Sequence, residues 1–188
     1  MTDAPADAVF SIEIDAPIAR VWDAVTDTTA VSPPMFNCVL HSTLEPGARM
    51  DYTDKAEKRC FLFGEVIEIT PPTRFVHTFV FGFYNDLPTR VEWELEELSA
   101  GRTRVTVKHT GLAEGSKTNR DIRSGWPTIL RRFKEQIERG RLPLTDRIKL
   151  GVMNAMSFML PKRLLKSNTD TRPSALPTTP PTGEHTDE

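Results

Sequence analysis

The stretch SGWPTILRRFKEQIERG, residues 124–140, decides the fold of this chain. Its apolar residues recur at the three- and four-residue spacing of one helical face, namely Trp126, Ile129, Leu130, Phe133 and Ile137. Oppositely charged residues four positions apart occupy the other face, where they support a solvated helix surface. Ser124 is a suitable N-cap, and Gly140 is a residue that typically ends a helix. The stretch therefore predicts an amphipathic helix whose apolar face, beginning with a tryptophan, covers another element.

Upstream of this helix, apolar residues alternate with polar ones, which is the pattern of strands with one buried face. The segment between residues 39 and 110 consists of such runs separated by turn residues. In TRVEWELEEL, residues 89–98, Val91, Trp93 and Leu95 share one face, and glutamates share the other. The glutamate face is either a solvated sheet surface or an acidic interaction surface. The alternation predicts an antiparallel sheet whose apolar side is covered by the helix.

The overall composition is that of an ordinary globular chain of 188 residues with a formal net charge of -2. A pI near 6.1 disfavours a nucleic-acid-binding protein, which is normally basic. No apolar run approaches the roughly 20 residues that cross a bilayer, and the N-terminus lacks the pattern of a signal peptide. Two cysteines, Cys38 and Cys60, are too few for a disulfide framework. These features predict a cytoplasmic protein without a nucleic-acid partner.

Several motifs occur in an order that resembles one known family. They are IDAPIARVWDAVTD (residues 14–27), GEVIEITPPTRFVHTF (64–79), GRTRVTVKHTG (101–111) and the pair Gly125-Trp126. The chain resembles the START-like (SRPBCC) superfamily, and within it the group named after the activator of the heat-shock protein 90 ATPase. This resemblance implies an α+β helix-grip fold, in which a curved seven-stranded antiparallel sheet wraps around a long C-terminal helix, with a short helical pair after strand 1. It also implies a deep apolar cavity between sheet and helix.

Composition and resemblance together divide the chain into four segments. They are a disordered N-terminus (1–7), a START-like domain (8–140), a basic and apolar helical extension (141–166) and a disordered proline-rich tail (167–188). The extension predicts a helix over residues 145–160. From residue 139 to residue 166, seven basic residues stand against one acidic residue. Three interpretations of this segment stay open: docking within the protein or a homodimer, peripheral contact with a membrane through residues 145–166, and binding of another protein.

Aromatic residues at inward-facing positions are the strongest indication of a function. Rigid rings on a curved sheet and one helix are difficult to pack without voids, so the set lines a pocket or fills a core. The residues expected to contact a ligand are Met50, Phe79, Phe81, Trp93, His109, Trp126, Ile129, Leu130 and Phe133. His109 shares the inward phase of its strand, where it is either the polar contact of the ligand or a hydrogen-bonded core residue.

The remaining motifs indicate neither a cofactor nor a metal. GLAEGSKT, residues 111–118, resembles a phosphate-binding loop, but its lysine does not directly follow the second glycine. Cys38, His41 and Cys60 lack the spacing of a four-ligand zinc site. We therefore expect non-catalytic binding of a small hydrophobic molecule, lipid-like or polyketide-like. The alternatives are a co-chaperone-like protein interaction module and a polyketide-cyclase-like enzyme that uses His109 as its base.

Overall fold

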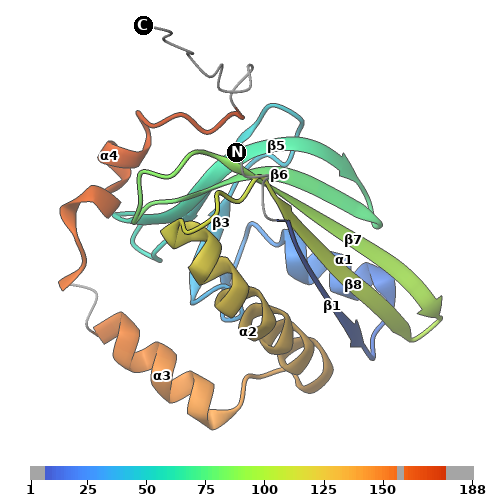
Figure 1. Cartoon of the computed structure of the whole chain (residues 1–188). Coiled ribbons are helices and arrows are strands. Elements are labelled where there is room, and N and C mark those ends of the chain that lie inside the picture. Colours follow the sequence, from blue (N-terminus) through green and yellow to red (C-terminus); the bar gives the residue numbers. More distant parts are fainter. Residues whose placement is uncertain (1–6, 156–158, 177–188) are drawn as a thin grey trace, which may run out of the picture.

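The computed structural model describes residues 7–155 and 159–176, and one curved antiparallel sheet forms its centre (Figure 1). The strands are β1 (Ala8–Ile14), β2 (Val31–Ser32), β3 (Cys38–His41), β4 (Arg49–Thr53), β5 (Cys60–Thr70), β6 (Arg74–Phe81), β7 (Thr89–Ser99) and β8 (Arg102–Thr110). Their hydrogen-bonded order is β1-β8-β7-β6-β5-β4-β3-β2. The sheet has eight strands instead of the expected seven, because the two-residue strand β2 pairs with β3. The α+β helix-grip fold itself is confirmed.

Strand β7 shows how the alternating sequence produces an apolar inner face. Val91, Trp93 and Leu95 point into the core, and each is at most 4% exposed. Trp93 lies opposite Phe75 of β6 and opposite Val107 of β8. Neighbouring strands therefore place apolar side chains side by side, and their burial provides the main stabilisation of the sheet.

The outer face of the same strands carries the glutamates predicted from the sequence, together with cations from the adjacent strands. The Arg74 side chain lies 3.0 Å from Glu68 and 3.2 Å from Glu94, and it also contacts Glu92. Lys108 of β8 approaches Glu94 to 2.8 Å. The glutamates are thus paired across strands, which is the arrangement of a solvated face whose individual ion pairs contribute little.

Helix α2 (Lys117–Arg139) crosses the inner face of the sheet, and it is longer than the sequence predicts (Figure 1). It begins at Lys117, where the Ser116 hydroxyl accepts a hydrogen bond of 3.0 Å from the Asn119 amide. The prediction that Ser124 caps this helix is wrong, since its hydroxyl instead donates within the helix to the Asp121 carbonyl at 3.2 Å. The first two turns of α2 were missed because they are mostly polar and continue no long apolar stripe.

The apolar stripe expected for this helix is confirmed, and so is its end. Trp126, Leu130, Phe133 and Ile137 are each at most 3% exposed. Gly140 adopts φ 70°, a left-handed conformation that favours glycine and ends the helix.

A single helix, α1 (Ile18–Thr26), follows β1, where the resemblance implied a helical pair. Its buried residues Val21, Trp22 and Val25 form the spacing of one helical face. After α1 the chain turns into β2 and β3, so the second half of the expected pair is replaced by the short edge strand.

Downstream of α2, the described residues form three further helices that lead the chain around the sheet. They are α3 (Leu144–Ala155), the 3-10 helix η2 (Lys162–Leu164) and α4 (Lys166–Thr169). Helix α3 begins one residue before the expected 145–160 helix, and residues 156–158 lie outside the described ranges. Figure 1 shows α3 near the lower part of α2 and α4 close to β5 and β6.

The segment after α3 contacts the outer face of the sheet, although the sequence predicts a disordered tail from residue 167. Leu164 is fully buried against Gly82, where an added Cβ would come within 2.7 Å of the leucine. Arg172 donates to the carbonyls of Phe81 and Gly82 at 3.3 and 3.1 Å, and its guanidinium lies 5.0 Å from the centre of the Phe63 ring. The contacts of Arg172 hold part of the segment after residue 167 against the sheet, although its composition predicts a disordered tail. The expectations for residues 1–6 and 177–188 lie outside the described residues.

Candidate ligand-binding cavity

A cavity of about 880 Å³ lies between the first half of α2 and the side of the sheet formed by β3 to β6. Its deepest lining residues are Met35, Cys38, Tyr52, Leu62, Phe79, Ile122 and Trp126, each at most 8% exposed. The end of α3 contributes Met153 and Asn154, and Leu160 follows from the next segment. The cavity is therefore built by the sheet, by the gripped helix and by the extension together.

Aromatic side chains dominate the walls of this cavity. They are Phe36, Tyr52, Phe61, Phe79, Phe81, Phe83, Tyr84 and Trp126. Phe79 and Phe81 lie on one face of β6 and meet edge to face, with ring centres 4.8 Å apart. Phe61 and Phe83 stack with centres 6.2 Å apart. Because paired rings hold each other in place, the walls present fixed ring faces and edges to an apolar guest.

Two small residues of α2 line the cavity between the larger side chains of Ile122, Trp126 and Ile129. Ser124 and Gly125 line the cavity, and a Cβ added to Gly125 would meet no atom within 4 Å. The next residue, Trp126, also lines the cavity but is 2% exposed, so it forms part of the inner wall. The bulky first anchor of the predicted helix thus stands beside a gap in the helix surface.

Polar groups gather at the more exposed part of the lining. The Tyr84 hydroxyl donates to Asp121 at 2.5 Å, and this hydrogen bond raises the pKa of Tyr84 above its ordinary value. Outside the lining, the Lys117 ammonium lies 5.8 Å from the centre of the Tyr84 ring. Asp54 and Lys55, in the loop after β4, add one charge of each sign. These groups are able to orient the polar end of a guest whose apolar part lies deeper.

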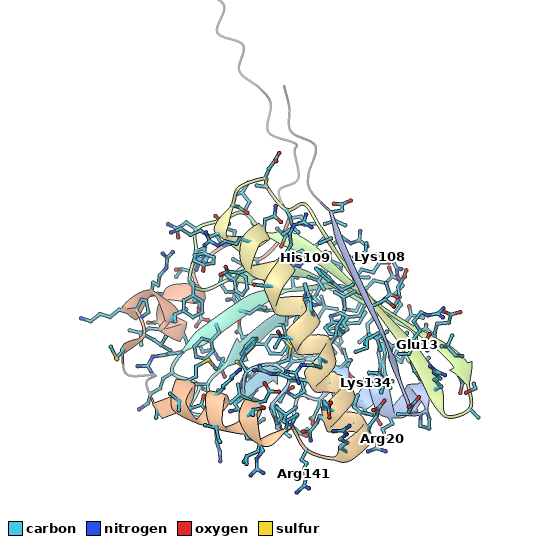
Figure 2. The ribbon with its side chains drawn as sticks, turned by 60° about the horizontal axis from the view of Figure 1, so that its bottom comes forward. Glu13, Arg20, Lys108, His109, Lys134 and Arg141 are labelled. Atoms are coloured by element: carbon cyan, nitrogen blue, oxygen red, sulfur yellow. The ribbon has the colours of Figure 1, made fainter. Side chains whose placement is uncertain are left out.

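His109 lies beside this cavity in a closed chain of hydrogen bonds. Trp126 Nε1 donates to His109 Nδ1 at 3.1 Å, so His109 Nε2 carries the proton and donates to Thr89 Oγ1 at 2.7 Å. Thr89 Oγ1 in turn donates to the Phe79 carbonyl at 3.1 Å. Burial lowers the pKa of His109 to about 3, which keeps the ring neutral at physiological pH. Both ring nitrogens are thereby occupied in fixing the core. Figure 2 shows His109 close to α2.

The structure brings four of the nine predicted ligand contacts into the cavity lining. These are Phe79, Phe81, Trp126 and Ile129. The other five are each at most 3% exposed and lie in the core outside the lining, namely Met50, Trp93, His109, Leu130 and Phe133. The alternation along a strand shows only that a residue points inward, so it selects the lining residues and the core residues alike. It does not show which part of the inner face α2 covers.

Sequence reasoning missed the lining residues that come from loops and from α3. Phe83 and Tyr84 follow β6, and Met35 and Phe36 follow β2. One available signal was the alternation of phenylalanine at positions 79, 81 and 83, which continues past the strand end. The contribution of Met153 depends on how α3 packs, and no local pattern predicts that.

The described ranges 7–155 and 159–176 contain no group of three or more His, Cys, Asp or Glu residues placed to hold a metal ion. Cys38 lines the cavity as an unpaired, buried thiol, and burial raises its pKa to about 12. It therefore contacts a guest as a small apolar group and not as a thiolate. Within the same ranges, no helix is long and apolar enough to cross a membrane.

Several solved structures share this fold. An HSP90 activator from Plasmodium falciparum has a TM-score of 0.59 at 18% identity, covering 71% of this chain and 96% of its own. DynU16, from the dynemicin biosynthetic locus, has a TM-score of 0.59 at 21% identity, covering 72% of this chain and 48% of its own. The Aha1 dimer from Colwellia psychrerythraea has a TM-score of 0.59 at 15% identity, covering 73% of this chain and 99% of its own. No curated protein matches the chain.

The sequence also matches a family model, over residues 15–138, described as Activator of Hsp90 ATPase homolog 1-like protein. This span contains α1, strands β2 to β8 and all but the last residue of α2, so it includes most of the cavity walls. The chain therefore belongs to the Activator of Hsp90 ATPase homolog 1-like family, within the START-like (SRPBCC) helix-grip superfamily.

Proposed function

We propose that this protein binds a small hydrophobic molecule, without catalysis, in the cavity between α2 and the sheet. The observation that carries the proposal is the cavity itself, whose volume of about 880 Å³ falls within the range typical of small-molecule sites. A hydrophobic core of ordinary packing density contains few voids larger than a water molecule. A space of this size beside eight aromatic residues is the arrangement expected of a binding site.

The shape and chemistry of the walls favour a rigid, ring-containing guest over a flexible chain. Fixed aromatic pairs such as Phe79 and Phe81 offer flat and edge-on contacts to a planar molecule, which loses little conformational entropy on binding. The Tyr84–Asp121 pair and Lys55 would meet a hydroxyl, carbonyl or acidic group of that molecule near the opening. A polyketide-like aromatic compound therefore fits the proposal better than an acyl lipid.

The test begins with protein purified from cells, analysed by native mass spectrometry and by organic extraction of any bound molecule. Gly125→Leu is the decisive variant, because its side chain would enter the empty space beside Trp126 without meeting an atom near its Cβ. Gly101→Leu is the matched control, since Gly101 also has no atom within 4 Å but lies in the exposed turn between β7 and β8.

We expect Gly125→Leu to weaken binding of the extracted molecule, or of the neutral fluorescent probe N-phenyl-1-naphthylamine, at least about tenfold, which corresponds to about 1.4 kcal/mol. Gly101→Leu should bind like the wild type. A protein that is isolated empty and whose two leucine variants take up the probe equally well would rule out the cavity as the binding site.

Family membership favours a second function, the binding of a chaperone ATPase as a co-chaperone-like module. In that case the exposed sheet face would carry the activity. Charge reversal at Glu92 and Glu94 should then abolish stimulation of the ATPase, and Gly125→Leu should leave it intact. The two functions are thus separated by opposite responses to substitutions on opposite faces of the sheet.

The proposal contains no catalytic step, because both nitrogens of His109 already have hydrogen-bond partners and the ring is buried. A cyclase-like activity would need a base among the residues of the cavity lining instead. A cytoplasmic location is part of the proposal, since two unpaired thiols are typical of a reducing compartment.

A further inference from the structure

Helix α3 has two apolar sides, and only one of them contacts the rest of the protein. Leu150 is 3% exposed and packs inward, and Asp146 beside it is 5% exposed. Leu144, Ile148 and Val152 are 66%, 57% and 55% exposed. Residues four apart lie on the same side of a helix, so these three form one outward stripe on the side opposite Asp146 and Leu150.

The orientation of this stripe is fixed by a buried ionic contact. Asp146 accepts hydrogen bonds from Arg131 at 2.8 Å and from Arg132 at 3.3 Å, both of which belong to α2. Breaking such a contact would leave the buried Arg132 without its carboxylate partner, which is costly. Rotation of α3 to bury Leu144, Ile148 and Val152 would require that loss, so the stripe stays exposed.

The surroundings of the stripe are cationic. Arg147 and Lys149 project from α3 on either side of it, and both are exposed. Arg141 points away from the protein in the loop between α2 and α3, at the lower edge of Figure 2. The single acidic residue of α3, Asp146, is already paired with the two arginines of α2. The outward side of α3 therefore combines apolar side chains with positive charges that form no ion pair among residues 7–155 and 159–176.

A hollow of about 540 Å³ lies next to α3, between that helix and the end of α2. Its polar lining comes from Asn37, Gln136, Arg141 and Arg147, and the residues described there include no carboxylate. Two guanidinium groups with neighbouring amides form a suitable environment for a phosphate group.

We infer that α3 docks on the surface of an anionic lipid bilayer. The stripe of Leu144, Ile148 and Val152 enters the boundary between headgroups and acyl chains, while Arg141, Arg147 and Lys149 contact lipid phosphates. An amphipathic helix with cations beside its apolar side binds membranes in this way. A second copy of the chain is a poorer occupant, because two such faces would bring the same cations against one another.

This inference is independent of the proposed cavity ligand, but it brings the two sites together. Met153 lies on the side of α3 away from the stripe and lines the cavity. Docking through α3 would therefore hold the cavity close to the bilayer, where an apolar molecule is able to enter.

The test is co-sedimentation of the full chain with vesicles of phosphatidylcholine, with or without about 30% phosphatidylserine. The double variant Ile148→Asp with Val152→Asp removes the stripe at positions that are more than half exposed, so we expect the fold to be kept, and circular dichroism checks this. Leu87→Asp is the matched control, because Leu87 is 70% exposed in the segment before β7.

We expect the wild type and Leu87→Asp to sediment with the anionic vesicles, and the double variant to bind at least tenfold less. Arg147→Ala with Lys149→Ala should weaken binding at low salt, and binding by the wild type should decline as salt is added. Equal binding to vesicles of phosphatidylcholine alone would overturn the inference, as would no binding to either type. A wild-type dimer that the double variant converts to a monomer would assign the stripe to a second copy instead.

Discussion

The inner face of the sheet has two regions that are equally aromatic, yet only one of them is filled. Beneath the middle of α2, Trp93 meets Trp126 and Phe133 edge to face, with ring centres 5.1 and 5.8 Å apart. On the β5–β6 side, Phe79 and Phe81 meet each other and face open space. Aromatic content therefore does not distinguish a core from a cavity. One difference is that two small residues of α2, Ser124 and Gly125, border the unfilled region.

Polar contacts hold α2 over the filled region. Lys134 Nζ donates to the Glu13 carbonyl at 2.7 Å, and Arg20 of α1 donates to the Ile137 carbonyl at 2.5 Å. The labelled residues Glu13, Lys134 and Arg20 lie near the same end of the helix in Figure 2. In the first half of α2, Ser124 and Gly125 line the cavity beside Ile122 and Trp126. Polar contacts such as that between Asp121 and Tyr84 also hold the first half of α2, so the unfilled region coincides with the small residues of the helix and not with a lack of contacts.

The largest expected effect comes from removing a ring in the filled region. Trp93→Ala should lower the free energy of unfolding by about 3–5 kcal/mol, because it leaves a void among close-packed rings. Phe81→Ala should cost less than about 2 kcal/mol, because Phe81 is only partly buried and already borders an empty space. Urea unfolding of both variants, followed by circular dichroism, measures the difference. Equal losses would mean that the two regions are packed alike.

Acid pH should test the hydrogen-bonded chain at the boundary of the two regions. The pKa of His109 is about 3 in the folded protein, whereas an unfolded histidine titrates near 6.5. Below about pH 6.5 the unfolded state therefore binds more protons than the folded state, so the free energy of unfolding falls as the pH falls. Above that pH, His109 is neutral in both states and does not change the stability. Between pH 7 and pH 4 we expect His109 alone to lower the free energy of unfolding by about 3 kcal/mol.

The control for this prediction is His109→Gln, which cannot titrate. Buried His77, whose pKa burial lowers to about 4, contributes in the same direction and remains in both proteins. The unfolding free energy of the variant, measured in urea at several pH values, should depend less steeply on pH by about one proton, or about 1.4 kcal/mol per pH unit. Identical slopes would show that folding does not lower the pKa of His109.

The sequence predicted those parts of the fold that repeat a local pattern. The stripe from Trp126 to Ile137 and the alternation of Val91, Trp93 and Leu95 each extend over several residues, so tertiary context did not override them. Strand β2 escaped prediction because two residues carry no period. The start of α2 was misplaced because Ser116 and Ser124 are both suitable caps, and a polar first turn does not discriminate between them.

The candidate site was predictable only in part, because a cavity depends on which parts of the sheet the helix leaves uncovered. The alternation of residues along β6 correctly predicts that Phe79 and Phe81 point inward. The same reasoning also selects Trp93 and Met50, which are buried in the core outside the cavity. Telling them apart requires knowing which region α2 covers. The informative residue was Gly125, whose lack of a side chain is visible in the sequence but acquires meaning only from its position on the helix.

The smallest expected effect concerns that glycine. Within a helix, glycine is less favourable than alanine by about 0.5–1 kcal/mol, because it loses more backbone freedom on folding. Gly125 has no positive φ and no atom within 4 Å of an added Cβ, so Gly125→Ala should raise the free energy of unfolding by about that amount. Urea unfolding of Gly125→Ala beside Gly101→Ala, which lies outside any helix, isolates the helical contribution.

A stabilised Gly125→Ala that also binds the hydrophobic guest less well would show that the opening in α2 is retained for binding at the expense of stability. An unchanged or lower stability would mean that the helix surface at Gly125 is not open, and the filled and unfilled regions would then differ for another reason.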